Sequence, residues 1–230
     1  MNIHGLQKLT LLDYPGKTAC TVFLAACDFR CPFCHNSQLL DAGAAELVMD
    51  DEELLRFLKK REGMLDGVAF TGGEPLLSPE LPALLRRIRT MDYAIKLDTN
   101  GNQPQRLRAL IDEGLVDYVA MDVKNALPRY GETVGVAGFD TANIEQSIRL
   151  LLEDRVDYEF RTTVVRELHD ESSFRGIAEL IKGAKRYYLQ CFTDRDSVPF
   201  AGLHAPEEAD LRRYAEIVRP YVESVELRGV

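Results

Sequence analysis

Short apolar segments alternate with amphipathic segments along almost the whole chain. The apolar segments predict strands, at residues 18–27, 66–73, 93–101, 116–124, 157–165, 185–192 and 224–229. The amphipathic segments predict helices, at residues 50–61, 78–89, 103–114, 140–155, 171–184 and 206–220. The segment 125–139 is rich in glycine and weakly periodic, so it is expected to be a loop.

Strands that alternate with helices predict a parallel sheet, because the crossover between parallel strands needs a helix. About six such units are visible, fewer than the eight of a closed TIM barrel. The sequence therefore predicts an α/β fold with parallel strands, in the form of a partial open (β/α)6-type barrel. Because no linker, repeat or low-complexity segment interrupts the pattern, residues 1–230 are expected to form a single domain.

Polar residues and glycines follow several of the predicted strands. They are Cys27 after the first strand, Gly72, Gly73 and Glu74 after the second, Asp98 and Thr99 after the third, and Asp122 and Lys124 after the fourth. In α/β folds the loops after the strands carry the chemistry. One shared cleft is therefore expected at the carboxyl ends of the strands.

The balance of charge limits the classes of partner. The chain has a net charge of -9 and no basic run outside a helix end, which argues against nucleic acid and against an anionic membrane surface. No segment is apolar over the length of a bilayer, and the first residues lack the pattern of a signal peptide. A cytoplasmic location is expected by default.

Three of the five cysteines fall within residues 26–36, as Cys27, Cys31 and Cys34. In a reducing compartment such a cluster favours a metal site over a disulfide, and the C-x3-C-x2-C spacing suits an iron–sulfur cluster or zinc. A structural zinc needs four ligands. The fourth would have to be His35, Cys20 or Cys191, of which only Cys191 could conceivably reach. Three cysteines would instead leave one iron of a 4Fe–4S cluster open to a substrate or cofactor.

Two motifs carry a resemblance to a known family. The segments "CDFRCPFC" (27–34) and "TGGEP" (71–75) together resemble the radical S-adenosylmethionine (SAM) superfamily. The segments "GLQKLTLLDYPGK" (5–17), "LDTNG" (97–101) and "MDVK" (121–124) are similar to the glycyl-radical-enzyme activating proteins of that superfamily. The resemblance covers most of the chain.

The resemblance implies both a reaction and its partners. Cys27, Cys31 and Cys34 would hold one 4Fe–4S cluster, and the reduced cluster would cleave bound SAM into methionine and a 5′-deoxyadenosyl radical. That radical would remove a hydrogen atom from a glycine of a glycyl radical enzyme, with anaerobic ribonucleoside-triphosphate reductase as the expected partner. The chain lacks cysteines for a second cluster, so the electron is expected from reduced flavodoxin or ferredoxin.

The resemblance also implies roles for residues outside the cysteine motif. Gly72, Gly73 and Glu74 would receive the SAM ammonium group, and Phe33 would lie near the adenine. Asp98, Thr99 and Asp122 would help to hold a monovalent cation beside the SAM carboxylate. Lys124 would meet that carboxylate or the partner's backbone, Arg161 the carboxylate or the ribose, and Gln190 the ribose or the adenine.

Several of these residues also have a purely structural interpretation. The two glycines could form a strand-to-helix turn, Phe33 could pack in its loop, and the acidic residues could cap turns or helices. Arg161 could lie on the exposed face of an edge strand. His35 is expected to support the cysteine loop through hydrogen bonds, and His4, His169 and His204 are expected at the surface or in loops.

Two other functions remain open from the sequence. One is a radical SAM enzyme that acts on a small molecule, as the deazapurine-forming synthases do. The other is a zinc-stabilised interaction module with Cys27, Cys31, Cys34 and Cys191 as ligands, which leaves the TGGEP segment and the polar strand ends unexplained.

Overall fold

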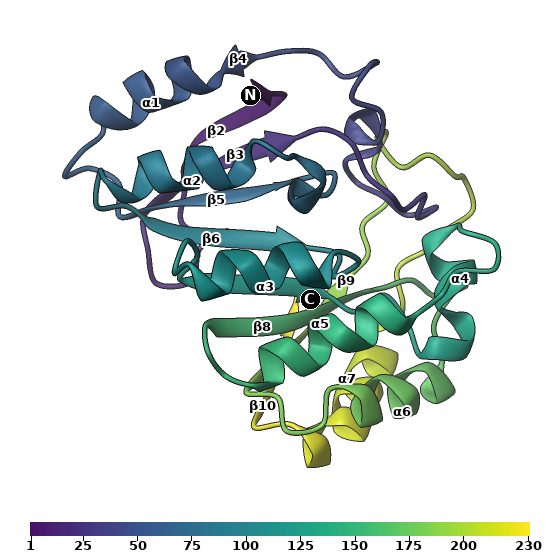
Figure 1. The fold of residues 1–230 in the computed structure, drawn as a ribbon. Helices are drawn as coiled ribbons and strands as arrows, with labels where there is room; N and C mark the ends of the chain where they lie inside the picture. The colour runs from purple at the N-terminus through teal and green to yellow at the C-terminus, as the bar shows by residue number, and fades with distance from the viewer. The chain divides into compact units, whose positions relative to one another are not determined.

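The computed structural model describes residues 1–230 (Figure 1). These residues form two compact units, each made of three separate segments of the chain. The first unit comprises Met1–Asp28, Gln38–Thr99 and Gln105–Val119. The second comprises Phe29–Ser37, Asn100–Pro104 and Ala120–Val230. A single domain over residues 1–230 stays a prediction.

The first unit is built on a mostly parallel sheet with the strand order β6-β5-β3-β2. Its strands are β2 (Gly5–Thr10), β3 (Ala19–Leu24), β5 (Gly67–Gly72) and β6 (Ala94–Thr99). Strand β3 is parallel to β5, and β5 to β6, whereas β2 is antiparallel to β3. Two short strands, β1 (Asn2–Ile3) and β4 (Met49–Asp50), form a separate antiparallel pair.

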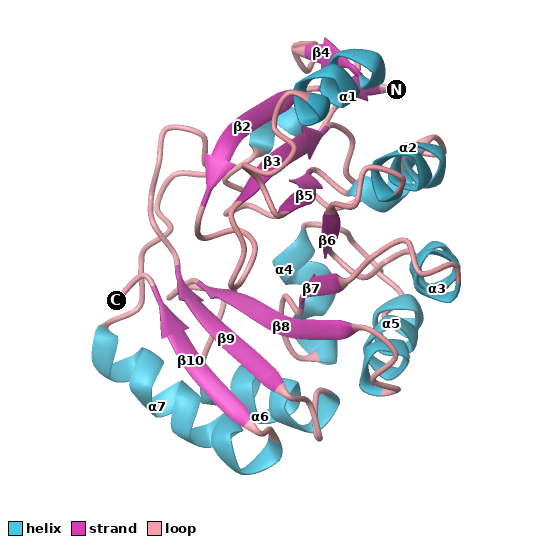
Figure 2. Ribbon diagram, turned by 90° about the vertical axis from the view of Figure 1, so that its left-hand side faces the viewer, coloured by secondary structure: helices cyan, strands magenta, loops and turns pink.

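Three helices lie along one face of these strands (Figure 2). They are α1 (Asp51–Lys59), α2 (Leu81–Arg89) and α3 (Pro104–Asp112), and two short 3-10 helices are η1 (Ser37–Leu39) and η2 (Pro75–Leu77). Helix α1 begins with a capping box, in which Asp50 and Glu53 each accept a hydrogen bond from the other's backbone N–H. Its apolar stripe is fully buried at Leu54 and Leu58, as the amphipathic pattern predicts.

The second unit carries the later strands. Strand β7 (Tyr118–Asp122) enters it from the first unit, and β8 (Asp157–Val164), β9 (Arg186–Cys191) and β10 (Ser224–Arg228) follow in parallel register. The helices are α4 (Tyr130–Val134), α5 (Ala142–Leu152), α6 (Glu171–Leu180) and α7 (Glu208–Val218), with the 3-10 helices η3 (Leu127–Arg129) and η4 (Arg219–Tyr221). Helices α6 and α7 cover one face of β8, β9 and β10 (Figure 2).

The segment 125–139 was expected to be a loop, and that prediction is wrong for its middle part. Helices η3 and α4 occupy Leu127–Val134, and Tyr130 is fully buried there. The Tyr130 ring packs on Phe29 and Phe139, with ring centroids 6.4 and 5.7 Å away. This aromatic packing orders a segment whose glycines suggest a loop.

The predicted fold class is confirmed. Both units alternate strands with helices, and the strands run parallel among β3, β5 and β6 and among β8, β9 and β10. Strand β2 pairs only with β3 and strand β10 only with β9, so neither unit closes into a barrel. None of the helices has the length and apolar character that crossing a membrane requires.

Candidate active site

The chain reaches Cys27 through a strained exit from strand β3. Ala26 has a φ of 78°, in the left-handed region that side chains seldom adopt. Its backbone N–H donates to the Leu39 carbonyl at 2.8 Å, and the Cys27 N–H donates to the Leu40 carbonyl at 3.2 Å. Cys27 is therefore held in place by two backbone hydrogen bonds, its own and that of Ala26, at a sharp turn.

The two glycines at the end of β5, Gly72 and Gly73, are required by the protein's own backbone. A Cβ atom on Gly72 would lie 2.2 Å from the Leu24 carbonyl oxygen, and one on Gly73 would lie 2.1 Å from the Ala26 carbonyl oxygen. The Gly73 N–H donates to Leu24 at 2.8 Å and the Glu74 N–H to Ala26 at 2.7 Å. The TGGEP turn thus lies directly against the residues that lead into Cys27.

The Glu74 carboxylate ties the ends of two strands together within the first unit. It is only 1% exposed, and its Oε1 accepts hydrogen bonds from the Leu76 backbone N–H at 3.0 Å and from Thr99 Oγ1 at 2.9 Å. Glu74 therefore caps η2 and fixes the end of β6. The structure brings Glu74 and Thr99 together, as expected from strands that end at one edge.

Asp98 lies near the same end of β6 and has a cationic partner on its own strand. The Lys96 ammonium group forms an ion pair with Asp98, and the Lys96 side chain is buried. A buried lysine needs such a partner because an isolated charge is costly to remove from water. The negative charge of Asp98 is thus compensated within the chain.

In the second unit, Cys31 and Cys34 lie on one turn, in which the Cys34 N–H donates to the Cys31 carbonyl at 3.1 Å. Burial raises the pKa of the Cys31 thiol to about 11 despite the opposing charge of Lys124, and burial also raises the pKa of Cys34. Without metal both thiols are protonated at neutral pH, so metal binding must release protons. Paired thiols on a partly buried turn beside a cation fit the donor set of an iron–sulfur cluster.

A compact ion triad faces the same turn. The Asp122 carboxylate accepts from Lys124 Nζ and from Arg161 Nε, each at 2.9 Å. Burial opposes the charge of Asp122, but Arg161 and Lys124 outweigh it and hold the pKa of the carboxyl well below its usual range. Burial likewise opposes the charge of Lys124, and Asp122 raises its pKa above the usual value. Arg161 is therefore paired and half-buried, not on an exposed edge.

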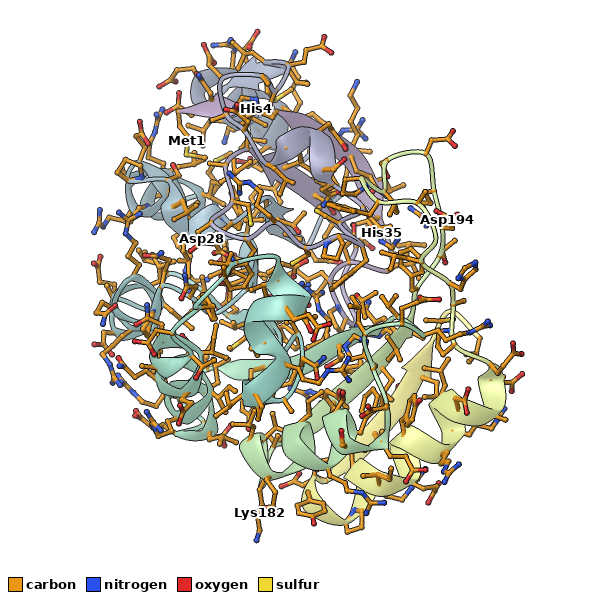
Figure 3. All side chains as sticks on the ribbon, turned by 90° about the vertical axis from the view of Figure 1, so that its right-hand side faces the viewer. Met1, His4, Asp28, His35, Lys182 and Asp194 are labelled. Atoms are coloured by element: carbon orange, nitrogen blue, oxygen red, sulfur yellow. The ribbon has the colours of Figure 1, made fainter.

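The aromatic and histidine residues of the cysteine loop are also fixed. Phe33 is buried, and Lys124 Nζ lies 5.9 Å from its ring centroid. The His35 ring stacks on Phe192 at 5.5 Å, and its Nε2 hydrogen-bonds the Thr193 carbonyl at 2.7 Å. Figure 3 places His35 beside the segment that carries Asp194. The loop is supported through His35, as the sequence suggests.

His169 was expected at the surface or in a loop, and it lies in the loop between β8 and α6. It is not at the surface, because the side chain is only 4% exposed. The ring accepts from the Val165 N–H through Nδ1 at 3.1 Å, so Nε2 donates to the Lys124 carbonyl at 2.8 Å. His169 thereby holds the backbone at Lys124 as a neutral imidazole. No local pattern signals this role, because the partner lies 45 residues away.

The stability of the protein should fall when the pH drops below about 6.5, partly because of His169. Burial lowers the pKa of His169 below 6.5, so the unfolded chain binds a proton more readily than the folded chain does. The contribution is fully present above that pH and is lost as the pH falls toward the folded pKa. Urea unfolding midpoints between pH 5 and 8 would measure this. Replacing His169 by glutamine, which offers one donor and one acceptor without titrating, should flatten the slope; an unchanged slope would contradict the assignment.

Gln190 lies on strand β9. Its side chain is half-buried, and its register neighbours are Thr163 on β8 and Arg228 on β10. Cys191 is only partly buried, whereas Cys20 is fully buried in β3, where burial raises its pKa to about 12. Cys20 is therefore a small residue of the core, whereas Cys191 is only partly covered.

Comparisons with known proteins agree with the motifs. Residues 21–181 match the Radical SAM superfamily. A protein of Methanocaldococcus jannaschii, whose name assigns it provisionally as a glycyl-radical enzyme activating enzyme, is 31% identical over 99% of this chain and 96% of its own length. A 7-carboxy-7-deazaguanine synthase of Koribacter versatilis is 30% identical over 67% of this chain and 65% of its own.

A solved structure has a similar fold at low sequence identity. A domain of a pyruvate-formate lyase-activating enzyme from Bacteroides vulgatus superposes with a TM-score of 0.59 and 21% identity. The similarity covers 71% of this chain and 99% of that domain. At this identity the comparison supports the fold alone.

Proposed function

Because the chain belongs to the radical SAM superfamily and is therefore a radical SAM enzyme, we propose that it activates a glycyl radical enzyme. The observation that carries the proposal is the similarity to the M. jannaschii protein over nearly the full length of both chains. Enzymes of this superfamily use SAM and a 4Fe–4S cluster, and the donor set fits such a cluster.

In the proposal, Cys27, Cys31 and Cys34 are the three ligands of the cluster. When bound, the reduced cluster and SAM supply the radical that takes a hydrogen atom from the partner's glycine. The strained exit from β3 and the turn at Gly72 and Gly73 fix the approach to Cys27. Rigid placement of ligands lowers the cost of ordering them when the group binds.

The remaining assigned residues bind and orient SAM. Lys124, charged and held by Asp122, would receive the SAM carboxylate, with Arg161 beside it. Phe33 would lie near the adenine, Gln190 would hydrogen-bond the ribose or adenine, and the backbone of the Gly72–Glu74 turn would receive the ammonium group. The Glu74 carboxylate already accepts from Leu76 and Thr99, which favours backbone oxygens for that contact.

The monovalent cation that the resemblance implies beside Asp98, Thr99 and Asp122 stays a prediction. Two acidic groups at neighbouring strand ends would repel each other unless positive charge compensates them. Each carboxylate has a cationic side chain as a partner, Lys96 for Asp98 and the pair Lys124 and Arg161 for Asp122. The negative charges are thus compensated without an ion.

Anaerobic ribonucleoside-triphosphate reductase is the proposed partner, and reduced flavodoxin or ferredoxin is the proposed electron donor. Both assignments follow from the motif resemblance. The second candidate function is a small-molecule reaction, favoured by the similarity to a 7-carboxy-7-deazaguanine synthase, although that similarity covers only 65% of the synthase.

Electron paramagnetic resonance should separate these functions. The anaerobically reconstituted, reduced protein should give a cluster signal that changes when SAM is added. A glycyl doublet should then appear only when the organism's anaerobic ribonucleotide reductase is also present. A SAM-responsive cluster without any doublet would favour another glycyl radical enzyme or a small molecule, and no cluster after reconstitution would contradict the proposal.

A further inference from the structure

A row of polar side chains crosses three neighbouring strands of the second unit. The strand register places Thr163 of β8, Gln190 of β9 and Arg228 of β10 opposite one another. Because alternate residues of a strand point to opposite faces, these three share one face. Tyr187 and Leu189, on the other face, are fully buried. Figure 2 shows α6 and α7 on one face of these strands, so the polar row lies on the face away from them.

Arg228 lies flat across this face and is held at two points. Its Nη1 and Nη2 donate to the two carboxylate oxygens of Glu159, at 2.9 and 3.0 Å. Its guanidinium carbon lies only 3.4 Å from the ring centroid of Tyr188, on the strand between them. Glu159 is 1% exposed, and the Arg228 side chain is 34% exposed. The guanidinium is thus rigid but reachable.

Several hydrogen-bonding groups on this face have no partner in the chain. The fork to Glu159 uses two of the five N–H donors of Arg228, which leaves three. The Gln190 amide and the Thr163 hydroxyl are half-buried and make no side-chain hydrogen bond with the protein. The row spans about 10 Å, since neighbouring strands lie about 4.8 Å apart, which is the length of about three extended residues.

The charge of the face indicates the kind of ligand. Glu159 neutralises Arg228, and the exposed Glu226, which is opposite Tyr188 in the register, adds negative charge. An anionic small molecule would meet no uncompensated cation in this row. Peptide carbonyl and N–H groups are neutral, and they match the donors of Arg228 and the hydroxyl of Thr163, which can both donate and accept.

Arg228 is also close to the ion triad described above. Its charge interacts electrostatically with that of Arg161, which is the residue proposed to orient SAM. Arg161 and Glu159 are two positions apart on β8, so both point to the face that carries the polar row. A ligand on the row would therefore lie next to the place proposed for the cofactor.

We propose that Arg228, held by Glu159 and Tyr188, is a positioning residue that binds the main chain of an extended, glycine-bearing segment of the partner, together with Thr163. This inference rests on the proposed function, because it names the substrate class of that same site as a peptide. The guanidinium, held by Glu159 and Tyr188, would fix the position of the bound segment along the strands, and its charge would be neutralised by Glu159.

Replacing Arg228 by lysine tests this directly. Lysine keeps a cation against Glu159 but loses the planar fork and the stacking on Tyr188. The probe is a synthetic peptide with capped ends that spans the glycine loop of the organism's anaerobic ribonucleotide reductase, titrated onto the reconstituted, SAM-bound protein. The Kd for the peptide and the KM for the whole reductase should each rise about tenfold or more. Iron content and uncoupled SAM cleavage should stay within about twofold.

Two further variants keep the test decisive. The double variant Glu159→Gln, Arg228→Gln removes both charges together, so no buried carboxylate is left unpaired if the lysine variant fails to fold. It should lose peptide binding equally. Arg212→Lys, at an exposed pair with Glu208 on α7, is the matched control and should bind the peptide as the wild type does.

The outcomes separate the inference from the proposed function. Peptide binding that is absent in the wild type, or unchanged in both Arg228 variants, would overturn the inference. A parallel loss of SAM cleavage would also overturn it, because Arg228 would then serve the cofactor or the fold. The glycyl doublet with the intact reductase is measured independently and decides the proposed function by itself.

Discussion

Replacing Cys31 by alanine should abolish assembly of the iron–sulfur cluster and cleavage of SAM. Cys31 is almost fully buried on the turn that also carries Cys34, and two remaining thiolates would leave a second iron without a terminal ligand. Iron and sulfide analysis after anaerobic reconstitution, together with the yield of 5′-deoxyadenosine under reducing conditions, would measure both losses. We expect iron near the background level and no detectable cleavage.

Two other cysteines of the chain provide matched controls. Cys20→Ala removes a buried thiol from strand β3 and should lower stability without changing the iron content. Cys191→Ala removes the only cysteine proposed as a fourth zinc ligand and should also leave the iron content unchanged. Retained SAM cleavage in the Cys31 variant would refute the ligand assignment. Loss of metal in the Cys191 variant would instead revive the zinc-stabilised module.

The alternation of apolar and amphipathic segments predicts most of the fold because it reflects burial on one face of a helix or on both faces of a strand. Prediction from this alternation fails where an element is weakly buried, or where the residues that pack against it are distant in the sequence. Strand β2 is mostly exposed and edges the sheet, so its residues show no apolar run. Helix α4 is ordered by Tyr130 packing on Phe29, about a hundred residues earlier, which no local pattern contains.

The candidate site follows the same rule. Spacing within one loop identifies the cysteines, because Cys27, Cys31 and Cys34 are close in sequence. Gly72 and Gly73 are also recognisable from the sequence as a turn. The reason why both must be glycine is their close contact with the backbone of Leu24 and Ala26, which depends on strand pairing.

The polar contacts of the second unit could not be predicted from local sequence patterns, because their partners are far apart along the chain. Glu159 and Arg228 form a bidentate pair across 69 residues, and His169 holds the Lys124 carbonyl across 45 residues. One signal of such a distant partner is present in the sequence, namely a charged residue within an apolar strand pattern. Glu159 interrupts a buried strand, where an unpaired carboxylate would be costly, and so requires a distant cation.

Replacing Gly73 by alanine should destabilise the first unit and impair binding of the cluster at Cys27. The added Cβ would lie 2.1 Å from the Ala26 carbonyl oxygen and 2.8 Å from its carbonyl carbon, so the backbone on one side must move. That movement would weaken the hydrogen bond from the Glu74 N–H to Ala26, which now measures 2.7 Å. We expect a loss of about 3 kcal/mol in the free energy of unfolding, at the upper end of overpacking effects.

Gly43→Ala is the matched control for this effect. A Cβ at Gly43 would meet only the Asp41 side chain, at 3.4 Å, and the backbone there needs no left-handed conformation. Urea unfolding of both variants and iron content after reconstitution would be compared with the wild type. Because Ala26 immediately precedes Cys27, the shift forced by Gly73→Ala should also lower iron content, whereas Gly43→Ala should change neither quantity. If Gly73→Ala keeps wild-type stability and iron, the close approach of the TGGEP turn to Ala26 is not what fixes Cys27.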